Sequence, residues 1–415
     1  MIGLIGKKLG HSYSKIIHEQ LGNHGYQMIE VDEFQLKELF EKKQILACNV
    51  TIPYKQTVLN YLDEMDDVTK DSHACNTIVY EHGKYVGHNT DAGGFEAMLR
   101  MNGIDVKGKK AIVLGNGGAS KAICWVLKKH GISEIILVKK NLSQETITYE
   151  ECYAKHTDAQ ILVNTSPVGM FPASDELVID LNYFDHLEAV LDVIYNPLST
   201  RLLTEARLRG IKTCGGLLML VAQAVEAAGY FQSKIFPDAI TGQLVESLVQ
   251  KKQNLVLIGM PGCGKSTIAE ALGIALGRRV VDLDAEIVKD IGMSIKNYFD
   301  LYGEEEFRNK ETELTKRFMN ETGCILSCGG GIVTRRENMV ALLQNGFVIW
   351  LKRDLNLLEV SESRPLSSKK QQLKALYEQR KDLYALYADA QIINEGTIEE
   401  TVHAIIETWK RGHLS

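Results

Sequence analysis

The stretch Asn254-Leu-Val-Leu-Ile-Gly-Met-Pro-Gly-Cys-Gly-Lys-Ser-Thr267 decides the fold of the second half of the chain. Its apolar run, 255–258, predicts a buried strand, and the glycines, lysine and serine after it match the phosphate-binding pattern G-x-x-x-x-G-K-[ST]. Backbone N–H groups of such a loop face one anion, beside the positive end of the next helix dipole. A purely structural glycine loop is the alternative, which the preceding strand disfavours. The expected phosphate contacts are Gly262, Cys263, Gly264, Lys265, Ser266 and Thr267, and Ser266 also serves Mg²⁺.

The bulk properties set limits on the rest. A P-loop normally lies on the first strand of its domain, so the preceding 250 or so residues of the 415 form something else. Hydrophobic and charged contents of 45% and 24% are those of soluble globular proteins, and a net charge of −6 disfavours nucleic-acid and membrane-surface roles. The eight cysteines form no C-x-x-C pair. With no secretory signal and no membrane-spanning run, we expect a cytoplasmic protein with small-molecule partners.

Polar side chains interrupt the apolar strands of the first 100 residues. Ser12 and Ser14 precede a predicted helix, where they either cap it or bind a small carboxylate. Lys55 follows a β-rich segment broken by a proline and is expected to start the next helix. Asn76 and Asp91 lie in polar turns, where such side chains often only shape the backbone.

From residue 109 the pattern becomes a βαβ unit. An apolar strand at Ala111–Leu114 is followed by a glycine turn, a helix at Lys121–His130 and a strand at Glu134–Val138. This arrangement is typical of dinucleotide binding. Lys139-Lys140 follow the second strand, where an acid would favour NAD(H); the lysines favour the 2′-phosphate of NADP(H), unless they are ordinary surface residues. The turn residues expected at the cofactor are Gly115, Asn116, Gly117, Gly118 and Ala119.

Residues 1–250 resemble shikimate dehydrogenase. The motifs that carry the resemblance are Ser12-x-Ser14 after His11, Asn49-Val-Thr51-x-Pro53-x-Lys55, Asn76-Thr77, Asn89-Thr-Asp91, Gly115-x-Gly-Gly-Ala119, Asn164-Thr-Ser-Pro-x-Gly-Met170, Tyr195-Asn-Pro197 and Gly216-x-x-Met-Leu-x-x-Gln223. The resemblance implies that the two serines hold the substrate carboxylate and that Lys55 lies beside the C3 oxygen, with Asp91 as its catalytic partner. It also implies a set of side chains around the ring hydroxyls and one further cofactor contact. These are Thr51, Asn76, Asp91, Tyr195 and Gln223 for the ring, and Gly216 for the cofactor.

The chain departs from that family at a few positions. Lys15 stands where a proline is common, Asn116 replaces an alanine of the glycine turn, and Lys139-Lys140 replace the usual Asn-Arg. The last departure leaves the preference between NADP and NAD open.

The second half places acids and arginines after the P-loop. Asp282 and Asp284 are expected to close a strand, where their i, i+2 spacing would put both carboxylates on one face. Arg308 lies in the helical motif Phe307-Arg308-x-x-Glu311, a glycine turn occupies Gly329–Gly331, and Arg380 lies on a late amphipathic helix. Arg364, in Arg364-Pro-Leu, is expected on a mobile lid.

In that order these motifs resemble shikimate kinase over residues 251–415. The resemblance implies that Asp284 contacts the acceptor hydroxyl, while Arg308, Arg380 and the Gly330 backbone hold the acceptor carboxylate. It also implies that Arg364 contacts the ATP phosphates, including the one that is transferred, and that Asp282 helps to hold Mg²⁺. Planar arginine forks suit a carboxylate better than the point charge of lysine does.

The sequence thus predicts an α/β fold in two parts. The first, 1–250, has an α/β substrate domain (about 1–100 plus 218–250) and a Rossmann-like NADP domain (about 101–217). A P-loop kinase domain with a parallel sheet, 251–415, follows a short linker at 250–253. The predicted function is reduction of 3-dehydroshikimate with NADPH, then phosphorylation of shikimate from ATP·Mg²⁺. The alternatives are quinate or NAD in the first half, and a non-catalytic module in either half.

Overall fold

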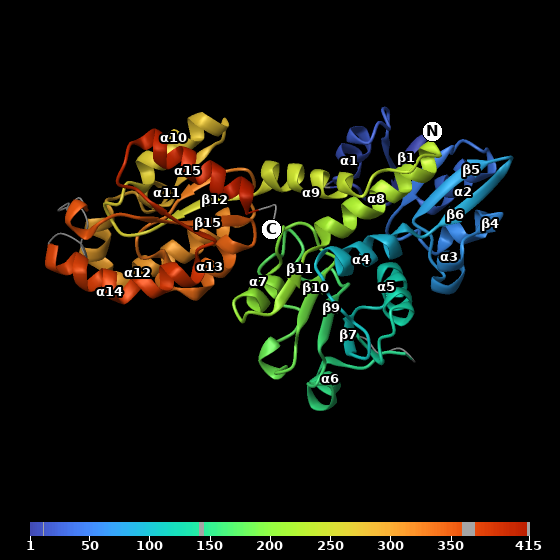
Figure 1. Ribbon diagram of the computed structural model, residues 1–415, viewed down its shortest axis with the longest axis horizontal. Helices are drawn as coiled ribbons and strands as arrows, with labels where there is room; N and C mark the ends of the chain where they lie inside the picture. The colour runs from blue at the N-terminus through green and yellow to red at the C-terminus, as the bar shows by residue number, and fades with distance from the viewer. Residues whose placement is uncertain (11, 141–144, 359–369, 413–415) are drawn as a thin grey trace. The chain divides into compact units, whose positions relative to one another are not determined.

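The computed structural model describes residues 1–10, 12–140, 145–358 and 370–412. Within them the chain folds into two compact units (Figure 1). The first comprises Met1–Val168, Leu177–Asn196 and Arg209–Val245, and the second Gly169–Glu176, Pro197–Leu208 and the chain from Glu246 onward. Each sheet lies wholly inside one unit. The fold-class prediction of α/β architecture with parallel sheets is confirmed.

The first unit begins with a six-stranded mixed sheet in the order β2-β1-β3-β5-β6-β4. Parallel pairing joins β1 to β2 and β3, and β5 runs antiparallel to β3 and β6. A core of Ile, Val, Leu and aromatic side chains lies against it. Its strands are β1 (Ile2–Gly6), β2 (Gln27–Glu30), β3 (Ala47–Val50), β4 (Glu64–Met65), β5 (Thr77–Glu81) and β6 (Lys84–His88), and its helices are α1 (Ser14–Gln20), α2 (Glu33–Glu41), α3 (Asp67–Ser72) and α4 (Thr90–Met101).

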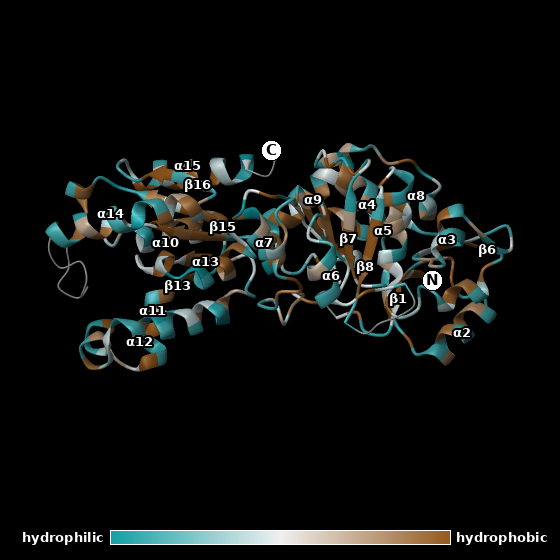
Figure 2. Ribbon diagram, turned by 90° about the horizontal axis from the view of Figure 1, so that it is seen from below, coloured by the Kyte–Doolittle hydropathy of each residue, from teal (hydrophilic) through white to brown (hydrophobic). Residues whose placement is uncertain are grey.

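A second, fully parallel sheet of the same unit has the order β11-β10-β9-β7-β8. Its interior strands β10, β9 and β7 are mostly apolar because parallel sheets are covered on both faces, and Figure 2 shows the edge strand β8 in the hydrophobic colour too. α8 packs along α4. The strands are β7 (Lys110–Leu114), β8 (Glu134–Val138), β9 (Ile161–Asn164), β10 (Ala189–Asp192) and β11 (Lys212–Cys214), with helices α5 (Gly118–Lys129), α6 (Tyr149–Lys155) and α8 (Gly216–Gln232).

The second unit is built on another parallel sheet, in the order β13-β14-β12-β15-β16. The P-loop strand β12 is central and buried at every residue, because it is paired on both sides. The strands are β12 (Asn254–Ile258), β13 (Val280–Asp282), β14 (Ile325–Ser327), β15 (Gly346–Lys352) and β16 (Ala390–Ile393). The helices are α7 (Arg201–Arg207), α10 (Lys265–Leu276), α11 (Leu283–Ile291), α12 (Ile295–Phe318), α13 (Arg336–Leu343), α14 (Lys370–Tyr387) and α15 (Ile398–Arg411).

The expected linker at 250–253 begins with the last residues of α9 (Ala239–Lys252), which continues to the residue before Gln253. Two local predictions were wrong. Lys55 does not start a helix: it lies in a turn between β3 and a 3₁₀ helix at Thr57–Tyr61. Asp284 does not lie on a strand with Asp282, because β13 ends at Asp282, which caps α11 by accepting the N–H of Ala285. The same-face rule for strands therefore does not apply to these two acids.

None of the helices within the described ranges combines the length and the hydrophobicity needed to cross a bilayer.

Candidate active sites

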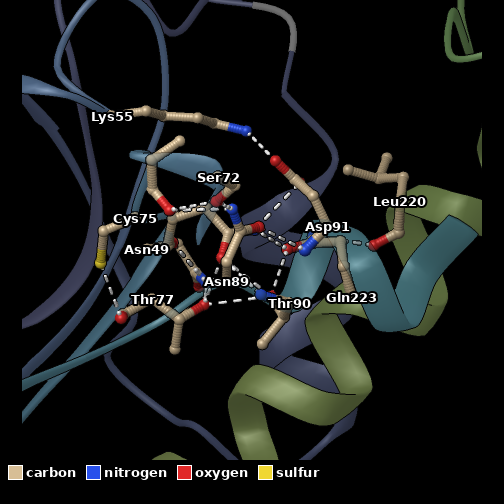
Figure 3. A network of polar contacts seen from close by, with 12 residues as sticks. Asn49, Lys55, Ser72, Cys75, Thr77, Asn89, Thr90, Asp91, Leu220 and Gln223 are labelled. Carbon is tan, nitrogen blue, oxygen red and sulfur yellow. Dashed lines mark hydrogen bonds and ion pairs between the residues drawn. The ribbon is translucent and has the colours of Figure 1, made fainter. Parts of the chain in front are cut away.

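A lysine–aspartate pair forms the centre of the first constellation. Lys55 Nζ donates to Asp91 Oδ2, and the two side chains are 17% and 9% exposed (Figure 3). Lys55 reaches in from the turn after β3, and Asp91 lies in the first turn of α4, capped by the Asn89 side chain. A half-buried ammonium held by a carboxylate can donate to an oxygen on which negative charge develops. The pair is 36 residues apart in sequence, so only the fold brings it together.

Amide side chains extend this pair into a network. Asn76 Nδ2 donates to Asp91 Oδ1 at 2.9 Å and to Gln223 Oε1 at 3.4 Å. Thr90 Oγ1 also donates to Gln223 Oε1, at 3.3 Å, and the Thr90 N–H donates to Asn76 Oδ1 at 2.8 Å. Figure 3 shows Gln223 reaching these groups from α8. The network therefore fixes the Asp91 carboxylate from the side opposite Lys55, and it joins α4, α8 and the residue before β5.

Hydroxyl groups gather at the start of α1. Ser12 Oγ donates to Ser14 Oγ at 2.9 Å and accepts the Ser14 N–H at 3.2 Å. The helix N-cap residue is Tyr13, whose side chain makes no capping bond, so neither serine occupies the N-cap position. Tyr195 is brought to the same place: its ring lies 5.2 Å from that of Tyr13. Burial raises the pKa of Tyr195, against the lowering effect of a hydrogen bond with the Ser12 side chain.

Thr51 lies directly after β3, four residues before Lys55. Its N–H donates to Ile5 O at 2.9 Å, which ties this residue to the end of β1. The structure thus collects the sequence-predicted polar residues of the first 100 positions, together with Tyr195 and Gln223, in one unit.

The glycine turn at 115–119 leads into α5 and approaches Lys55. A Cβ placed on Gly118 would lie 3.2 Å from Lys55 Cδ, so a larger residue there would press on the lysine stem. Gly216 is the first residue of α8, against the backbone of Val193. Lys139 and Lys140 lie beyond the end of β8 and are exposed. The turn and the lysines thus lie at the carboxyl ends of β7 and β8, where doubly wound folds bind dinucleotides.

The P-loop forms one wall of a pocket of about 450 Å³ in the second unit. Gly264 has φ +94°, a left-handed conformation that suits glycine, and precedes α10. The Lys265 ammonium is buried and donates to the carbonyls of Gly259 and Met260, each at 3.0 Å. Ser266 Oγ donates to Asp282 Oδ2 at 2.6 Å. A hydroxyl and a carboxylate side by side are the oxygen ligands that Mg²⁺ takes, with phosphates completing its shell.

Acids and arginines line the pocket on the β13 and β14 side. Glu311 is 1% exposed and accepts from Arg308 Nη1 at 2.8 Å. Burial alone would lower the pKa of Arg308, but Glu311 and Glu304 raise it; burial raises the pKa of Glu311 against the opposing effect of Arg308. Arg380 Nη1 donates to Gly330 O at 3.1 Å. A Cβ on Gly329 would lie 2.6 Å from Asp284 Oδ1, so Asp284, on α11, still reaches this group.

Some functional candidates were missed, and one lies outside the described residues. Thr90 and Glu311 stood inside motifs quoted above but received no role. No sequence pattern pointed to Asn394. This residue lines the pocket, and its Nδ2 donates to Cys263 O at 2.8 Å, which helps to fix the P-loop. Arg364 falls in the range that the structure does not describe. Within the described ranges, no three His, Cys, Asp or Glu side chains cluster as a metal site.

The chain is similar to known enzymes over most of its length. The "Shikimate dehydrogenase (NADP(+))" of Clostridium beijerinckii is 39% identical over 256 residues, which span 58% of this chain and 94% of that protein. The chain belongs to the shikimate dehydrogenase family. The model of the "Shikimate dehydrogenase substrate binding domain" matches residues 4–78 of it.

Two solved structures resemble the same part of this dehydrogenase. The crystal structure of a chorismate mutase/shikimate 5-dehydrogenase fusion protein from Clostridium acetobutylicum is 32% identical, with a TM-score of 0.57, covering 60% of this chain and 97% of that one. Quinate dehydrogenase from Corynebacterium glutamicum, in complex with NAD, is 27% identical, with a TM-score of 0.52, covering 60% of this chain and 98% of that one.

The model of "Shikimate kinase" matches residues 261–410, the region of the P-loop pocket. The chain is therefore a bifunctional shikimate-pathway enzyme, with a dehydrogenase half followed by a kinase half.

Proposed function

We propose that the chain reduces 3-dehydroshikimate to shikimate with NADPH in its first half and phosphorylates the 3-hydroxyl of shikimate with ATP·Mg²⁺ in its second half. The observation that carries the proposal is the Lys55–Asp91 pair facing a set of hydroxyl and amide groups in one unit. The P-loop pocket in the other unit, which Arg308 and Arg380 help to line, complements it. Both sites then take the same small acid, once as product and once as substrate.

In the first half we assign the carboxylate of the substrate to Ser12 and Ser14. Thr51, Asn76, Tyr195 and Gln223 orient the ring hydroxyls. NADPH would supply a hydride to the ketone carbon when bound. The glycine turn would hold its pyrophosphate, Gly216 would make one further cofactor contact, and Lys139 and Lys140 would hold its 2′-phosphate. Lys55 donates a proton to the C3 oxygen as negative charge develops there, and Asp91 holds the Lys55 side chain in place by accepting its hydrogen bond.

In the second half we assign the acceptor carboxylate to Arg308, Arg380 and the Gly330 backbone. Asp284 accepts the hydrogen bond of the acceptor hydroxyl and takes its proton as the new O–P bond forms and the bond to the ADP leaving group breaks. Lys265 and the P-loop N–H groups hold the phosphates. Bound Mg²⁺ neutralises phosphate charge, and Ser266 and Asp282 are the residues that would hold it. Arg364 is assigned to the transferring phosphate by family resemblance alone.

The proposed domain division follows these assignments. The substrate domain takes about 1–100 plus 218–250, the NADP domain about 101–217, and the kinase domain 251–415. We propose a cytoplasmic location, because all eight cysteines are free thiols and seven of them are buried.

A coupled assay of the whole chain tests the proposal. Given 3-dehydroshikimate, NADPH and ATP·Mg²⁺, the chain is expected to oxidise NADPH and release ADP in equal amounts, with shikimate 3-phosphate as the product by mass spectrometry. Omission of ATP should leave shikimate as the end product. Oxidation of NADPH without ADP release would contradict the kinase assignment. A kcat/KM for quinate with NAD that exceeds the value for shikimate with NADP would favour the quinate alternative, which the similarity to quinate dehydrogenase suggests.

A further inference from the structure

The glycine turn Gly329–Gly331 lies tightly between the P-loop and the acceptor side of the pocket. A Cβ on Gly330 would lie 2.7 Å from Pro261 Cδ, in the P-loop. A Cβ on Gly331 would collide with the Arg308 guanidinium. The turn therefore has contacts on both sides, and its exact position matters to each of them.

Two side chains of α14 hold the carbonyl in the middle of this turn. Arg380 Nη1 donates to Gly330 O at 3.1 Å, and Tyr384 Oη donates to the same oxygen at 2.5 Å. The two residues are four positions apart on the helix and so lie on one face of it. A peptide unit is planar, so these bonds also fix the direction of the Gly331 N–H at its other edge. That N–H has no acceptor among the residues that the structure describes, which leaves it available to a ligand.

The surroundings of Tyr384 keep its hydroxyl at this carbonyl. The side chain is fully buried, and its ring stacks on that of Trp350 with the centroids 5.7 Å apart. The hydroxyl also lies 3.9 Å from Met260 Sδ, in the P-loop. Burial raises the pKa of Tyr384, so the hydroxyl keeps its proton and acts as a donor. A buried carbonyl that loses a donor is destabilised, so this hydrogen bond has a measurable value.

The hydroxyl of Tyr384 also affects how Arg380 can be used. Arg380 donates from Nη1 to the carbonyl, while its Nε is buried and has no partner among the described residues. Without Tyr384, Arg380 would be the only donor that the described residues offer to Gly330 O. The guanidinium would then be drawn toward the turn. The tyrosine therefore helps to leave part of the guanidinium free for a ligand in the pocket.

From these contacts we propose that Tyr384 is a positioning residue for the acceptor of the kinase half. Its hydroxyl holds the Gly330 carbonyl, so that the Gly331 N–H and the Arg380 guanidinium are presented together to the acceptor carboxylate. Tyr384 itself is not among the residues that line the pocket. It therefore sets the affinity for the acceptor, whereas the transfer of the phosphoryl group does not depend on it. The inference rests on the proposed function, because it takes the acceptor to be shikimate.

The substitution Tyr384→Phe tests the proposal, because it removes one oxygen and keeps the ring that stacks on Trp350. ADP release by the full chain is measured with supplied shikimate and ATP·Mg²⁺, and with no nicotinamide cofactor present. We expect KM for shikimate to rise about tenfold, the size of one hydrogen bond to a buried carbonyl, and kcat to stay within about threefold of wild type. Calorimetric titration with Mg·ADP should give a Kd within about twofold of wild type.

A second tyrosine of α14 provides the matched control. Tyr387 is also buried and lies three residues further along the helix. Tyr387→Phe removes the same atom from the same element, so it should change neither KM for shikimate nor Kd for Mg·ADP. Retained binding of Mg·ADP also shows that the kinase half of a variant is folded.

An unchanged KM for shikimate in Tyr384→Phe would overturn the inference. A fall in kcat together with weaker binding of Mg·ADP would also overturn it, because the hydroxyl would then support the whole pocket and not the acceptor side. A wild-type chain that phosphorylates no shikimate would overturn the kinase proposal and this inference together. An active wild-type chain with the same KM in Tyr384→Phe would overturn the role of Tyr384 alone.

Discussion

The dehydrogenase site and the kinase site differ in how they use charge. The first has one ion pair, Lys55 with Asp91, inside a network of amides and hydroxyls. The second is dense in charge: Arg308, Arg380 and Lys265 are all less than 9% exposed, with Glu311 buried among them. Hydride transfer to a ketone develops one negative oxygen, which one cation can serve. Phosphoryl transfer handles several anionic oxygens at once, so it needs several buried cations.

The contrast also lies in how the cations are fixed. Lys55 is held by one carboxylate, that of Asp91, and an ammonium group can give up a proton. Arg308 is held by Glu311 and also contacts Glu304, and Arg380 is tied to the Gly330 carbonyl. Planar guanidinium groups fixed in this way can grip a carboxylate but cannot give up a proton near neutral pH. Under the proposed function, the oxygen at C3 faces a proton donor in the dehydrogenase site, whereas the carboxylate of the same acid is bound by fixed guanidinium groups in the kinase site.

Substitution of Lys55, the cation of the dehydrogenase site, should have the largest effect on a reaction rate. Lys55→Ala is expected to lower dehydrogenase kcat by about 10³-fold. The substitution removes both the proton donor and the positive charge that lies beside the C3 oxygen. Phosphorylation of supplied shikimate should continue at the wild-type rate. Exposed Lys70→Ala is the matched control, with both rates unchanged. Equal loss of both activities would show that the two sites are not independent.

Replacement of Asp284 at the kinase site should give the opposite pattern, with loss of kinase activity and retention of dehydrogenase activity. Asp284→Asn keeps the shape but removes the proton acceptor, so kinase kcat should fall about 10²- to 10³-fold, with NADPH oxidation unchanged. Glu286→Gln, in the same first turn of α11, is the control, because that glutamate pairs with Lys289 instead. A kinase rate within twofold of wild type would remove Asp284 from the mechanism.

The cofactor preference should change by a smaller factor. Replacing both Lys139 and Lys140 with alanine removes two exposed cations at the end of β8. We expect the ratio of kcat/KM for NADPH to that for NADH to fall about tenfold, because only NADPH carries the 2′-phosphate. Steady-state kinetics with each cofactor measures the ratio. A wild-type preference for NADH would contradict this role of the lysines.

A further effect is on stability instead of rate, and it concerns how the stability of the dehydrogenase half depends on pH. His18 is fully buried, stacked on Tyr26, and burial lowers its pKa to about 4 from 6.5. The unfolded chain therefore takes up a proton first as the pH falls. The stability of this half should be intact above pH 6.5 and decline between about 6.5 and 4, by up to about 3 kcal/mol.

Denaturant titration followed by NADPH-oxidation activity at each pH measures this decline. His18→Gln should flatten it, although the variant is less stable at pH 7 because it disturbs the stack with Tyr26 and Phe231. The exposed His82 serves as control, since His82→Gln should leave the pH profile unchanged. An identical profile for His18→Gln would show that other groups cause the decline.

Local sequence alone determined the features that depend on neighbouring residues. The P-loop and the turn at 115–119 were predictable, because each is a glycine pattern between an apolar strand and a helix, which fixes its backbone. The α/β class followed from the alternation of apolar strands and helices. Family motifs added the residues of each site by resemblance.

Tertiary structure decided what depends on contacts between distant residues. Gln223 meets Asn76 across 147 positions, and Arg380 meets Gly330 across 50, so no local pattern could show that they touch. β13 ends at Asp282 because this residue caps α11, so Asp284 lies on the helix and the two-residue spacing of a strand does not place both carboxylates on one face. Arg353 follows an ordinary buried strand, and only the order of the strands around β12 puts it in the pocket. Side-chain chemistry is written in the sequence, but the distance between side chains is a property of the packed fold.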